Sequence, residues 1–170
     1  DFHPSAPVLE ALKAAVTEGR DRYCPVQGLP ALREELAHYL ARTRGLEVAG
    51  DQIVIAPGCK IALFFALVAL IEAGDEVLYP DPGFPGYPSI TRGLGGVPVA
   101  YELPERSGLQ PDPEQVASRI TPRTKVILPI NQYGQTADME AINAVAKTHG
   151  LFVLEDAAQS HGARCRGAAA

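Results

Sequence analysis

The amino-acid sequence predicts an α/β fold in which a mainly parallel sheet lies between two layers of helices, a three-layer α/β/α arrangement. The first observation is that short apolar segments alternate with longer helical segments from Gln52 onward. The second is that these short segments are apolar at almost every position, as strands covered on both faces are. The third is size, because 170 residues with 46% hydrophobic residues can bury a core of their own.

The N-terminal part of the sequence predicts helices. Apolar residues recur at helical spacing at Val8, Leu9, Leu12 and Val16. A second apolar stripe follows at Leu32, Leu36 and Leu40. Pro30 suits the first position of that second helix, where no N–H is needed, and Gly45 suits its end. We expect residues 1–50 to form an N-terminal helical segment that packs on a larger α/β domain formed by residues 51–170.

Five apolar segments of the larger part predict strands, at residues 53–55, 77–79, 97–101, 125–130 and 151–154. Longer helical patterns cover residues 58–74 and 137–148, and the proline-rich residues 80–88 predict a loop. In parallel sheets, ligands bind outside the carboxyl ends of the strands. Candidate functional residues are therefore sought at those ends.

The segment from Ala56 to Lys60 joins the first predicted strand to the helix that follows it. Gly58 permits close approach of another group to the backbone, and the N–H groups after it lie at a helix N-terminus, which attracts anions. Lys60 adds a positive charge. Phosphate binding is one interpretation, and an ordinary strand-to-helix turn that binds nothing is the other.

Polar and aromatic residues follow three other predicted strands. Phe84 lies among prolines that could hold its ring against a flat ligand, or it could anchor the loop in the core. Asp156 follows an apolar strand, where a carboxylate favours a cation or a hydrogen-bond donor, or it could cap the next helix. Asn131 and Gln159 could converge on the same crevice or satisfy loop backbone groups.

Composition excludes several classes of function. The formal net charge of −5 and the lack of a Lys/Arg run argue against a nucleic-acid binder. The longest apolar run, residues 61–71, is too short to span a bilayer. Three distant cysteines, Cys24, Cys59 and Cys165, show no metal-binding spacing, so we expect reduced thiols in a cytoplasmic protein without a metal site or a membrane partner.

Several motifs resemble known families. Tyr23-x4-Gly28-x-Pro30, Ala56-Pro-Gly58-Cys-Lys60 and Tyr79-Pro-Asp-Pro-Gly-Phe-Pro-Gly-Tyr87 resemble the class I/II aminotransferases. This resemblance begins at Asp1 and reaches about Lys125. From about Pro129 to Ala163, including Glu155-Asp-Ala-Ala-Gln-Ser-His-Gly, the chain resembles the DegT/DnrJ/EryC1 aminotransferases. Both resemblances imply the large domain of a fold type I transferase that depends on pyridoxal 5′-phosphate (PLP).

The resemblance assigns the phosphate group of PLP to the first of these motifs. Gly58, Cys59 and Lys60 would cradle the phosphate with their backbone and side chains. Tyr23 matches a tyrosine that reaches across a dimer interface to the phosphate bound by the partner. The resemblance therefore also implies a homodimer.

The resemblance assigns the pyridine ring of PLP to the other candidates. Phe84 would stack on the ring, and Asp156 would pair with the pyridine nitrogen. Gln159 would reach the phenolic oxygen of the ring. Asn131 matches a residue that contacts the same oxygen in the class I/II family, whereas the DegT/DnrJ/EryC1 family usually has histidine there.

One expected residue is absent. The resemblance implies a lysine downstream of Asp156 that binds PLP as a Schiff base, but Lys13, Lys60, Lys125 and Lys147 all precede Asp156. We therefore expect an incomplete large domain, a fragment without a catalytic residue and inactive by itself. The expected parent activity is transfer of an amino group from a small-molecule donor to a keto acid or keto-sugar acceptor.

Two alternatives stay open at this point. The first is a noncatalytic PLP-binding or dimerising module of the same fold. The second is a doubly wound nucleotide-binding protein, which is disfavoured because no GxGxxG follows any predicted strand.

Overall fold

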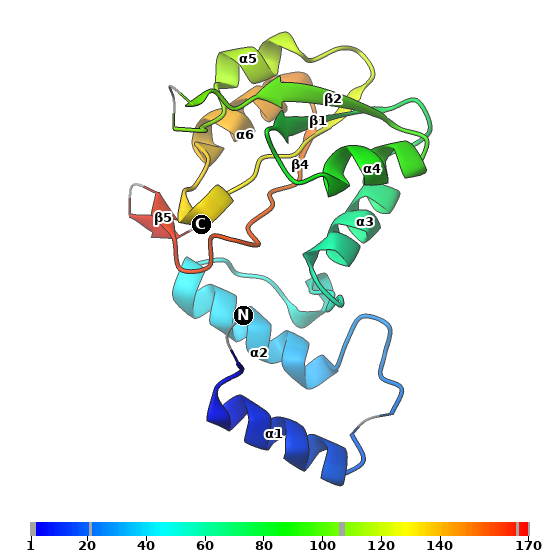
Figure 1. The fold of residues 1–170 in the computed structure, drawn as a ribbon, viewed down its shortest axis with the longest axis vertical. Coiled ribbons are helices and arrows are strands. Elements are labelled where there is room, and N and C mark those ends of the chain that lie inside the picture. Colours follow the sequence, from blue (N-terminus) through cyan, green and yellow to red (C-terminus); the bar gives the residue numbers. More distant parts are fainter. Residues whose placement is uncertain (1–2, 21, 106–107, 166, 170) are drawn as a thin grey trace.

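The computed structural model describes residues 3–20, 22–105, 108–165 and 167–169. Asp1, where the family resemblance begins, and Ala170, where the expected large domain ends, lie outside these residues. Figure 1 shows α1 (Ala6–Thr17) and α2 (Pro30–Arg44) on one side of the molecule and the sheet with its helices on the other. None of the helices in the described ranges has the length and apolar character needed to cross a membrane.

The centre of the molecule is a four-stranded parallel sheet in the order β2-β1-β3-β4. The strands are β1 (Glu76–Asp81), β2 (Val97–Glu102), β3 (Thr124–Ile127) and β4 (Phe152–Val153). Glu76 lies opposite Val97 on one side and Thr124 on the other. A separate antiparallel pair, β5 (Arg164–Cys165) and β6 (Ala168–Ala169), follows near the end of the chain. The parallel sheet predicted from the sequence is confirmed.

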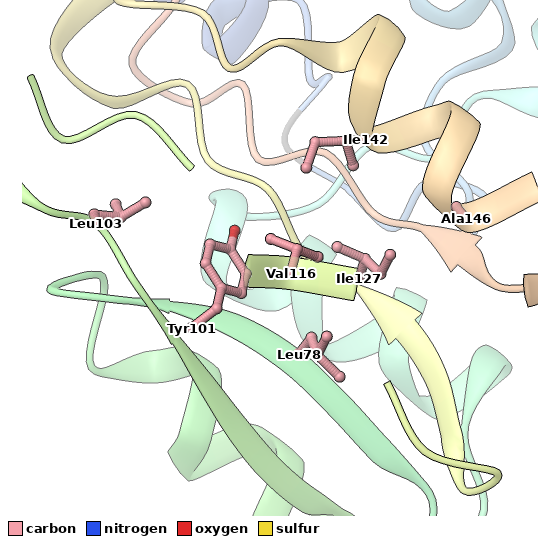
Figure 2. Close-up of a cluster of buried hydrophobic side chains, with 7 residues drawn as sticks. All are labelled: Leu78, Tyr101, Leu103, Val116, Ile127, Ile142 and Ala146. Carbon is pink, nitrogen blue, oxygen red and sulfur yellow. The ribbon is translucent and has the colours of Figure 1, made fainter. Parts of the chain in front are cut away.

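Helices cover both faces of this sheet, which gives three layers. Consecutive strand residues point to opposite faces, so Val77 packs toward α3 (Cys59–Leu70) and α4 (Gly86–Gly93), whereas Leu78 packs toward α5 (Pro113–Ser118) and α6 (Met139–His149). Figure 2 shows Ile142 and Ala146 of α6 facing the strand residues Leu78 and Ile127. On the first face, the buried core contains Leu63, Leu67, Val77, Tyr87, Val126 and Leu128.

The predicted strand at residues 53–55 is wrong, because this segment is extended but belongs to no sheet. Its backbone hydrogen bond runs from Ile55 N to Gln27 O at 2.9 Å. A strand needs a neighbouring strand to complete its ladder of hydrogen bonds, and β2 and β4, the outer strands of the sheet, do not pair with this segment. Apolar character alone did not reveal the missing partner.

The predicted loop at residues 80–88 is wrong at both ends, because Pro80 and Asp81 belong to β1 and α4 begins at Gly86. Pro85 is its N-cap, and Pro88 occupies the third helical position. Proline is compatible with both places because the first N–H groups of a helix have no partner within it. The short helix α5 also went unpredicted, although Asp112 caps it and Pro113 starts it. The other helices agree with the sequence, including the start of α2 at Pro30 and its end at Gly45, which has a φ of 65°.

The N-terminal helices differ in how they pack. Helix α1 has no buried residue, and its apolar stripe is exposed. Helix α2 contacts the rest of the chain through Arg33, whose Nη1 donates to Gly50 O at 3.1 Å, and through Tyr39, whose hydroxyl lies 2.9 Å from His161 Nε2. The division into an N-terminal helical segment and a larger domain at residue 50 stays a prediction.

Candidate functional site

The site lies where the carboxyl ends of the central strands meet. Beyond β3 and β4, one further bridge pairs Ile130 with Asp156. Two hydrogen bonds support it, from Asn131 N to Asp156 O at 3.0 Å and from Asp156 N to Pro129 O at 2.9 Å. This pairing continues the parallel sheet, so Asp156 is held by backbone geometry next to the end of β3.

A cavity of about 200 Å³ opens at this edge of the sheet, lined by Cys59, Lys60, Leu63, Phe84, Ile130, Asp156, Ala158 and Gln159. Five of the residues selected from the sequence therefore come together: Cys59, Lys60, Phe84, Asp156 and Gln159. A more apolar cavity of about 430 Å³ shares Cys59, Leu63, Asp156 and Ala158 with the first. The cavity of about 440 Å³ at the opposite ends of β3 and β4 contains none of the selected residues.

The N-terminus of α3 forms one wall of the smaller cavity. Gly58 precedes the helix with a φ of 97°, a conformation that favours glycine, and a Cβ atom added there would meet no atom within 4 Å. Ile61 N and Ala62 N both donate to Gly58 O at 3.2 Å. The N–H groups of Cys59 and Lys60 precede this ladder, so they are available to an anion in the open space beside Gly58.

Asp156 is held by two hydrogen bonds. Its Oδ2 accepts from the Tyr87 hydroxyl at 2.8 Å, and its Oδ1 accepts from Ala158 N at 3.0 Å. Burial, together with this contact to Asp156, raises the pKa of Tyr87 far above its usual range. The tyrosine therefore stays protonated and acts as a permanent donor to the carboxylate.

Tyr87 is the functional residue that sequence reasoning missed. It closes the motif from Tyr79 to Tyr87 but received no role, because its partner lies 69 residues away in the sequence. No local sequence pattern indicates a contact between two residues so far apart in the chain.

Phe84 combines the two roles that the sequence left open. Its half-buried ring packs against the core, where it meets Tyr87 edge-on with ring centroids 5.5 Å apart and an interplanar angle of 80°. It also lines the cavity, and the Lys60 Nζ lies 5.6 Å from its ring centroid. The Phe84 ring therefore lies between the core and the cavity, with the cation of Lys60 over its face.

The two amide residues behave differently. Gln159 lines the cavity, and its Oε1 accepts from Tyr133 N at 3.1 Å. Asn131 is fully buried and does not line the cavity. Its Nδ2 donates to Glu155 Oε1, and its Oδ1 accepts from Ala137 N at 2.8 Å. In this arrangement Asn131 braces the loop behind the cavity.

Tyr23 is the predicted residue that lies apart from the others. Its side chain is fully exposed in the segment between α1 and α2, and it lines none of the cavities described above. Gly58, although it does not line the cavity, adjoins it as the N-cap of α3. The cavity thus offers helix amides and Lys60 to an anion, an aromatic face to a flat ring, and a carboxylate to a cationic ring nitrogen. Among the described residues, no group of three or more His, Cys, Asp or Glu side chains is placed to hold a metal ion.

Curated proteins resemble this chain in sequence. The aspartate aminotransferase of Geobacillus stearothermophilus is 35% identical over 162 residues, and the aspartate/prephenate aminotransferase of Thermus thermophilus is 36% identical over 167 residues. These alignments cover 92% and 95% of this chain but 41% and 43% of the two relatives. The chain therefore spans less than half the length of these relatives.

Solved structures resemble the fold. An alanine aminotransferase from Pyrococcus furiosus superposes with a TM-score of 0.87 at 32% identity, over 92% of this chain and 42% of that one. Thermus thermophilus aspartate aminotransferase with maleate gives a TM-score of 0.85 at 35% identity, over 91% of this chain and 42% of that one. These matches confirm the predicted fold class, the parallel α/β fold of fold type I aminotransferases.

The sequence model of one family matches most of the chain, residues 31–170, including every predicted site residue except Tyr23. That range holds the complete parallel sheet and the cavity at its carboxyl edge. The chain belongs to the DegT/DnrJ/EryC1/StrS aminotransferase family.

Proposed function

We propose that this chain is the cofactor-binding part of a PLP-dependent aminotransferase. The observation that carries the proposal is the single cavity that combines the N-terminus of α3, the face of Phe84 and the carboxylate of Asp156. PLP is a flat pyridine ring that bears a phosphate and has a basic ring nitrogen. Each of these three features has a matching group on the cavity wall.

The residues of the cavity would each hold one part of PLP. The backbone amides of Cys59 and Lys60, next to the open space at Gly58, would bind the phosphate. Phe84 would stack on the pyridine ring, and the Asp156 carboxylate would accept a hydrogen bond from the protonated ring nitrogen. When bound, PLP supplies an electron sink for the bonds around the amino-bearing carbon of the substrate.

Gln159 and Asn131 have separate proposed roles. Gln159 would donate from its side-chain amide to the phenolic oxygen of PLP, since it lines the cavity. Contact between Asn131 and the same oxygen stays a prediction, and it would require the Asn131 amide to leave Glu155. In its present position, Asn131 would support the loop that carries Gln159 and Asp156.

The proposed reaction of the parent protein is transfer of an amino group from a small-molecule donor to a keto acid or a keto-sugar. Relatives named for aspartate and prephenate favour amino acids and keto acids, whereas the matched family also includes the sugar aminotransferases that the sequence resembles. The family lysine that binds PLP is not among the four lysines of this chain. The chain alone would therefore bind PLP without efficient turnover, and a noncatalytic PLP-binding or dimerising module is the alternative.

We also propose that the chain forms a homodimer in the cytoplasm. The fully exposed Tyr23 and the exposed apolar stripe of α1 support a second copy as the partner of this surface. Three free cysteines that are distant in sequence support a reducing compartment.

Titration of the purified chain with PLP, followed by absorbance and by calorimetry, tests the proposed function. Asp156→Ala should weaken binding by about tenfold or more, because a charge-assisted hydrogen bond contributes about 1.5–3 kcal/mol. Phe84→Ala should weaken binding by about two- to tenfold through the loss of stacking. Asp51→Ala and Phe152→Ala are matched controls, because both side chains are exposed and neither lines the cavity. A chain that binds no PLP, or binds it equally well in both site variants, would refute the proposal.

A further inference from the structure

We propose that Lys60 captures the aldehyde of PLP as a covalent imine. This inference rests on the proposed function, because it requires PLP to occupy the cavity. It concerns a position on α3, upstream of Asp156, and therefore a different lysine from the one implied by the family resemblance. The chain thereby gains a covalent cofactor site within its own 170 residues.

Lys60 is the lysine that lies at the site. All four lysines fall in the described part of the chain. Lys13 pairs with Glu10 on α1 at 2.8 Å, Lys125 lines the cavity at the opposite edge of the sheet, and Lys147 lies in the last turn of α6. Lys60 alone among them lines the cavity that contains Phe84 and Asp156.

The side-chain amine of Lys60 lies where the cofactor ring would stack. Its Nζ is 5.6 Å from the centroid of the Phe84 ring. A ring stacked on Phe84 would lie about 3.5–4 Å from that face, so the Lys60 amine would be at the ring or next to it. The flexible four-carbon stem of lysine lets the amine move aside to a ring substituent without any movement of α3.

No competing partner occupies the amine. None of the ion pairs Lys13–Glu10, Arg20–Glu18 and Arg123–Glu76 includes Lys60, and its Nζ contacts the face of the Phe84 ring. The carboxylate in the same cavity, Asp156, accepts from Tyr87 and Ala158. The Lys60 amine is therefore available for a reaction.

The backbone and the side chain of Lys60 would contact different parts of PLP. Its backbone N–H lies at the N-terminus of α3, before the intrahelical ladder that starts at Ile61, and it can bind the phosphate of PLP. Its side chain turns toward Phe84 and the ring. One residue would thus hold the cofactor at two points, through hydrogen bonding at the phosphate and through a covalent bond at the aldehyde.

The chemistry is a condensation. The Lys60 ammonium first gives one proton to solvent, and the lone pair of the resulting amine attacks the aldehyde carbon of PLP. The nitrogen then loses a second proton while the carbonyl oxygen takes one up, which gives a carbinolamine. Loss of that oxygen as water leaves a C=N bond between Nζ and the former aldehyde carbon. One amine and one aldehyde give one imine and one water, so no oxidant or reductant is needed.

Borohydride trapping and peptide mass spectrometry test this inference. The chain is mixed with one equivalent of PLP, reduced with sodium borohydride, and digested. The expected result is a pyridoxyl adduct on the peptide containing Lys60. Lys60→Arg, which keeps the positive charge and the backbone amide, should lose the adduct while still binding PLP noncovalently, and Lys125→Arg should retain the adduct. Asp156→Ala, which leaves Lys60 in place, should lose most of the adduct because PLP no longer binds in the cavity.

The possible outcomes separate the two proposals. If calorimetry shows PLP binding but Lys60 carries no adduct, or no more than Lys13, Lys125 and Lys147 carry, the inference about Lys60 is wrong and the proposed function stands. If PLP does not bind to the chain at all, the proposed function fails and the inference fails with it. Circular dichroism of Lys60→Arg confirms that a lost adduct does not reflect unfolding.

Discussion

At the scale of single residues, the contact between Tyr87 and Asp156 defines the site. The buried tyrosine donates to one carboxylate oxygen, and the backbone of Ala158 donates to the other. Because both oxygens accept hydrogen bonds, the Asp156 carboxylate keeps one orientation toward the cavity. Binding of a ring nitrogen to it would therefore cost less side-chain conformational entropy. Tyr87 is thus a positioning residue for Asp156.

Tyr87→Phe should weaken PLP binding without unfolding the chain. The substitution removes one buried hydrogen bond, which contributes about 1 kcal/mol, so PLP affinity should fall by about fivefold. Tyr101→Phe is the matched control, because that hydroxyl is also buried but donates to Leu128 O at 2.9 Å, away from Asp156. The two variants should lose similar thermal stability, and Tyr87→Phe alone should change the PLP titration. Equal PLP affinities for the two variants would contradict the positioning role.

The sequence predicted residues that act through local geometry and missed those that act through distant contacts. Gly58 and Asp156 could be selected because a strand end and a helix start are visible in local patterns. Asn131 could be selected for its residue type, but its burial and its contacts with Glu155 and Ala137 depend on the folded loop. Tyr87 could not be selected, because its partner, Asp156, lies beyond β4 and 69 residues further along the chain.

At the scale of elements, the sheet was predictable because its strand segments are apolar at almost every position, which is typical of strands covered on both faces. The strand at residues 53–55 failed by the same criterion, because its apolar residues indicate neither burial, since Val54 is 55% exposed, nor the presence of a neighbouring strand. Helix α4 was hidden by its prolines, which end helices when they lie inside but fit the first turn. Local sequence patterns therefore predict elements whose hydrogen bonds lie within the element better than elements that need a neighbouring segment.

A cluster at the amino end of β1 joins this strand to the start of β3. Glu76, with 2% of its surface exposed, accepts from Thr121 Oγ1 at 2.6 Å, from Thr124 Oγ1 at 3.2 Å and from Arg123 Nε at 3.1 Å. Burial acts to raise the pKa of Glu76, but the hydrogen bonds and the charge of Arg123 outweigh it and hold the pKa below the ordinary value of 4.5. The ionised carboxylate is therefore more favourable in the folded chain than in the unfolded chain.

This lowered pKa predicts a loss of stability in acid. The contribution of Glu76 is present above the unfolded-state pKa of about 4.5 and is lost as the pH falls through the lower folded-state pKa. Glu76→Gln should be less stable than the wild type at neutral pH, and the difference should shrink as the pH falls below that value. Glu114→Gln, at an exposed position on α5, should follow the wild type throughout. Chemical denaturation at several pH values measures the effect, and a difference that stays constant with pH would exclude it.

At the scale of the whole molecule, one run of exposed apolar side chains lies in the N-terminal arm, residues 3–20 and 22–29. Val8, Leu12 and Val16 on α1 are each more than half exposed, and Tyr23 is fully exposed. The sequence predicted α1 from this same stripe but could not show that the rest of the chain leaves the stripe uncovered. A continuous uncovered apolar stripe on one helix supports the proposed homodimer.

Leu12→Glu should disrupt the proposed dimer. A charge in the middle of the stripe would be buried without a partner on association, which strongly disfavours the dimer and leaves the monomer almost unaffected because Leu12 is 60% exposed. Glu10→Gln, elsewhere on α1, is the control. Sedimentation velocity over a range of protein concentrations should show a dimer for the wild type and the control but a monomer for Leu12→Glu. A wild-type chain that stays monomeric at all concentrations would rule out the dimer.

The contact between Tyr39 and His161 has a consequence for biosynthesis. The two residues are 122 positions apart, and their rings stack with an interplanar angle of 7°. At a translation rate of about 5–20 residues per second, α2 leaves the ribosome roughly ten seconds before His161 is made. During that interval the sheet is still incomplete, since β4 precedes His161 by only a few residues. The contact between α2 and His161 therefore forms only after β4 has been made, whereas the contact between Arg33 of α2 and Gly50 can form much earlier.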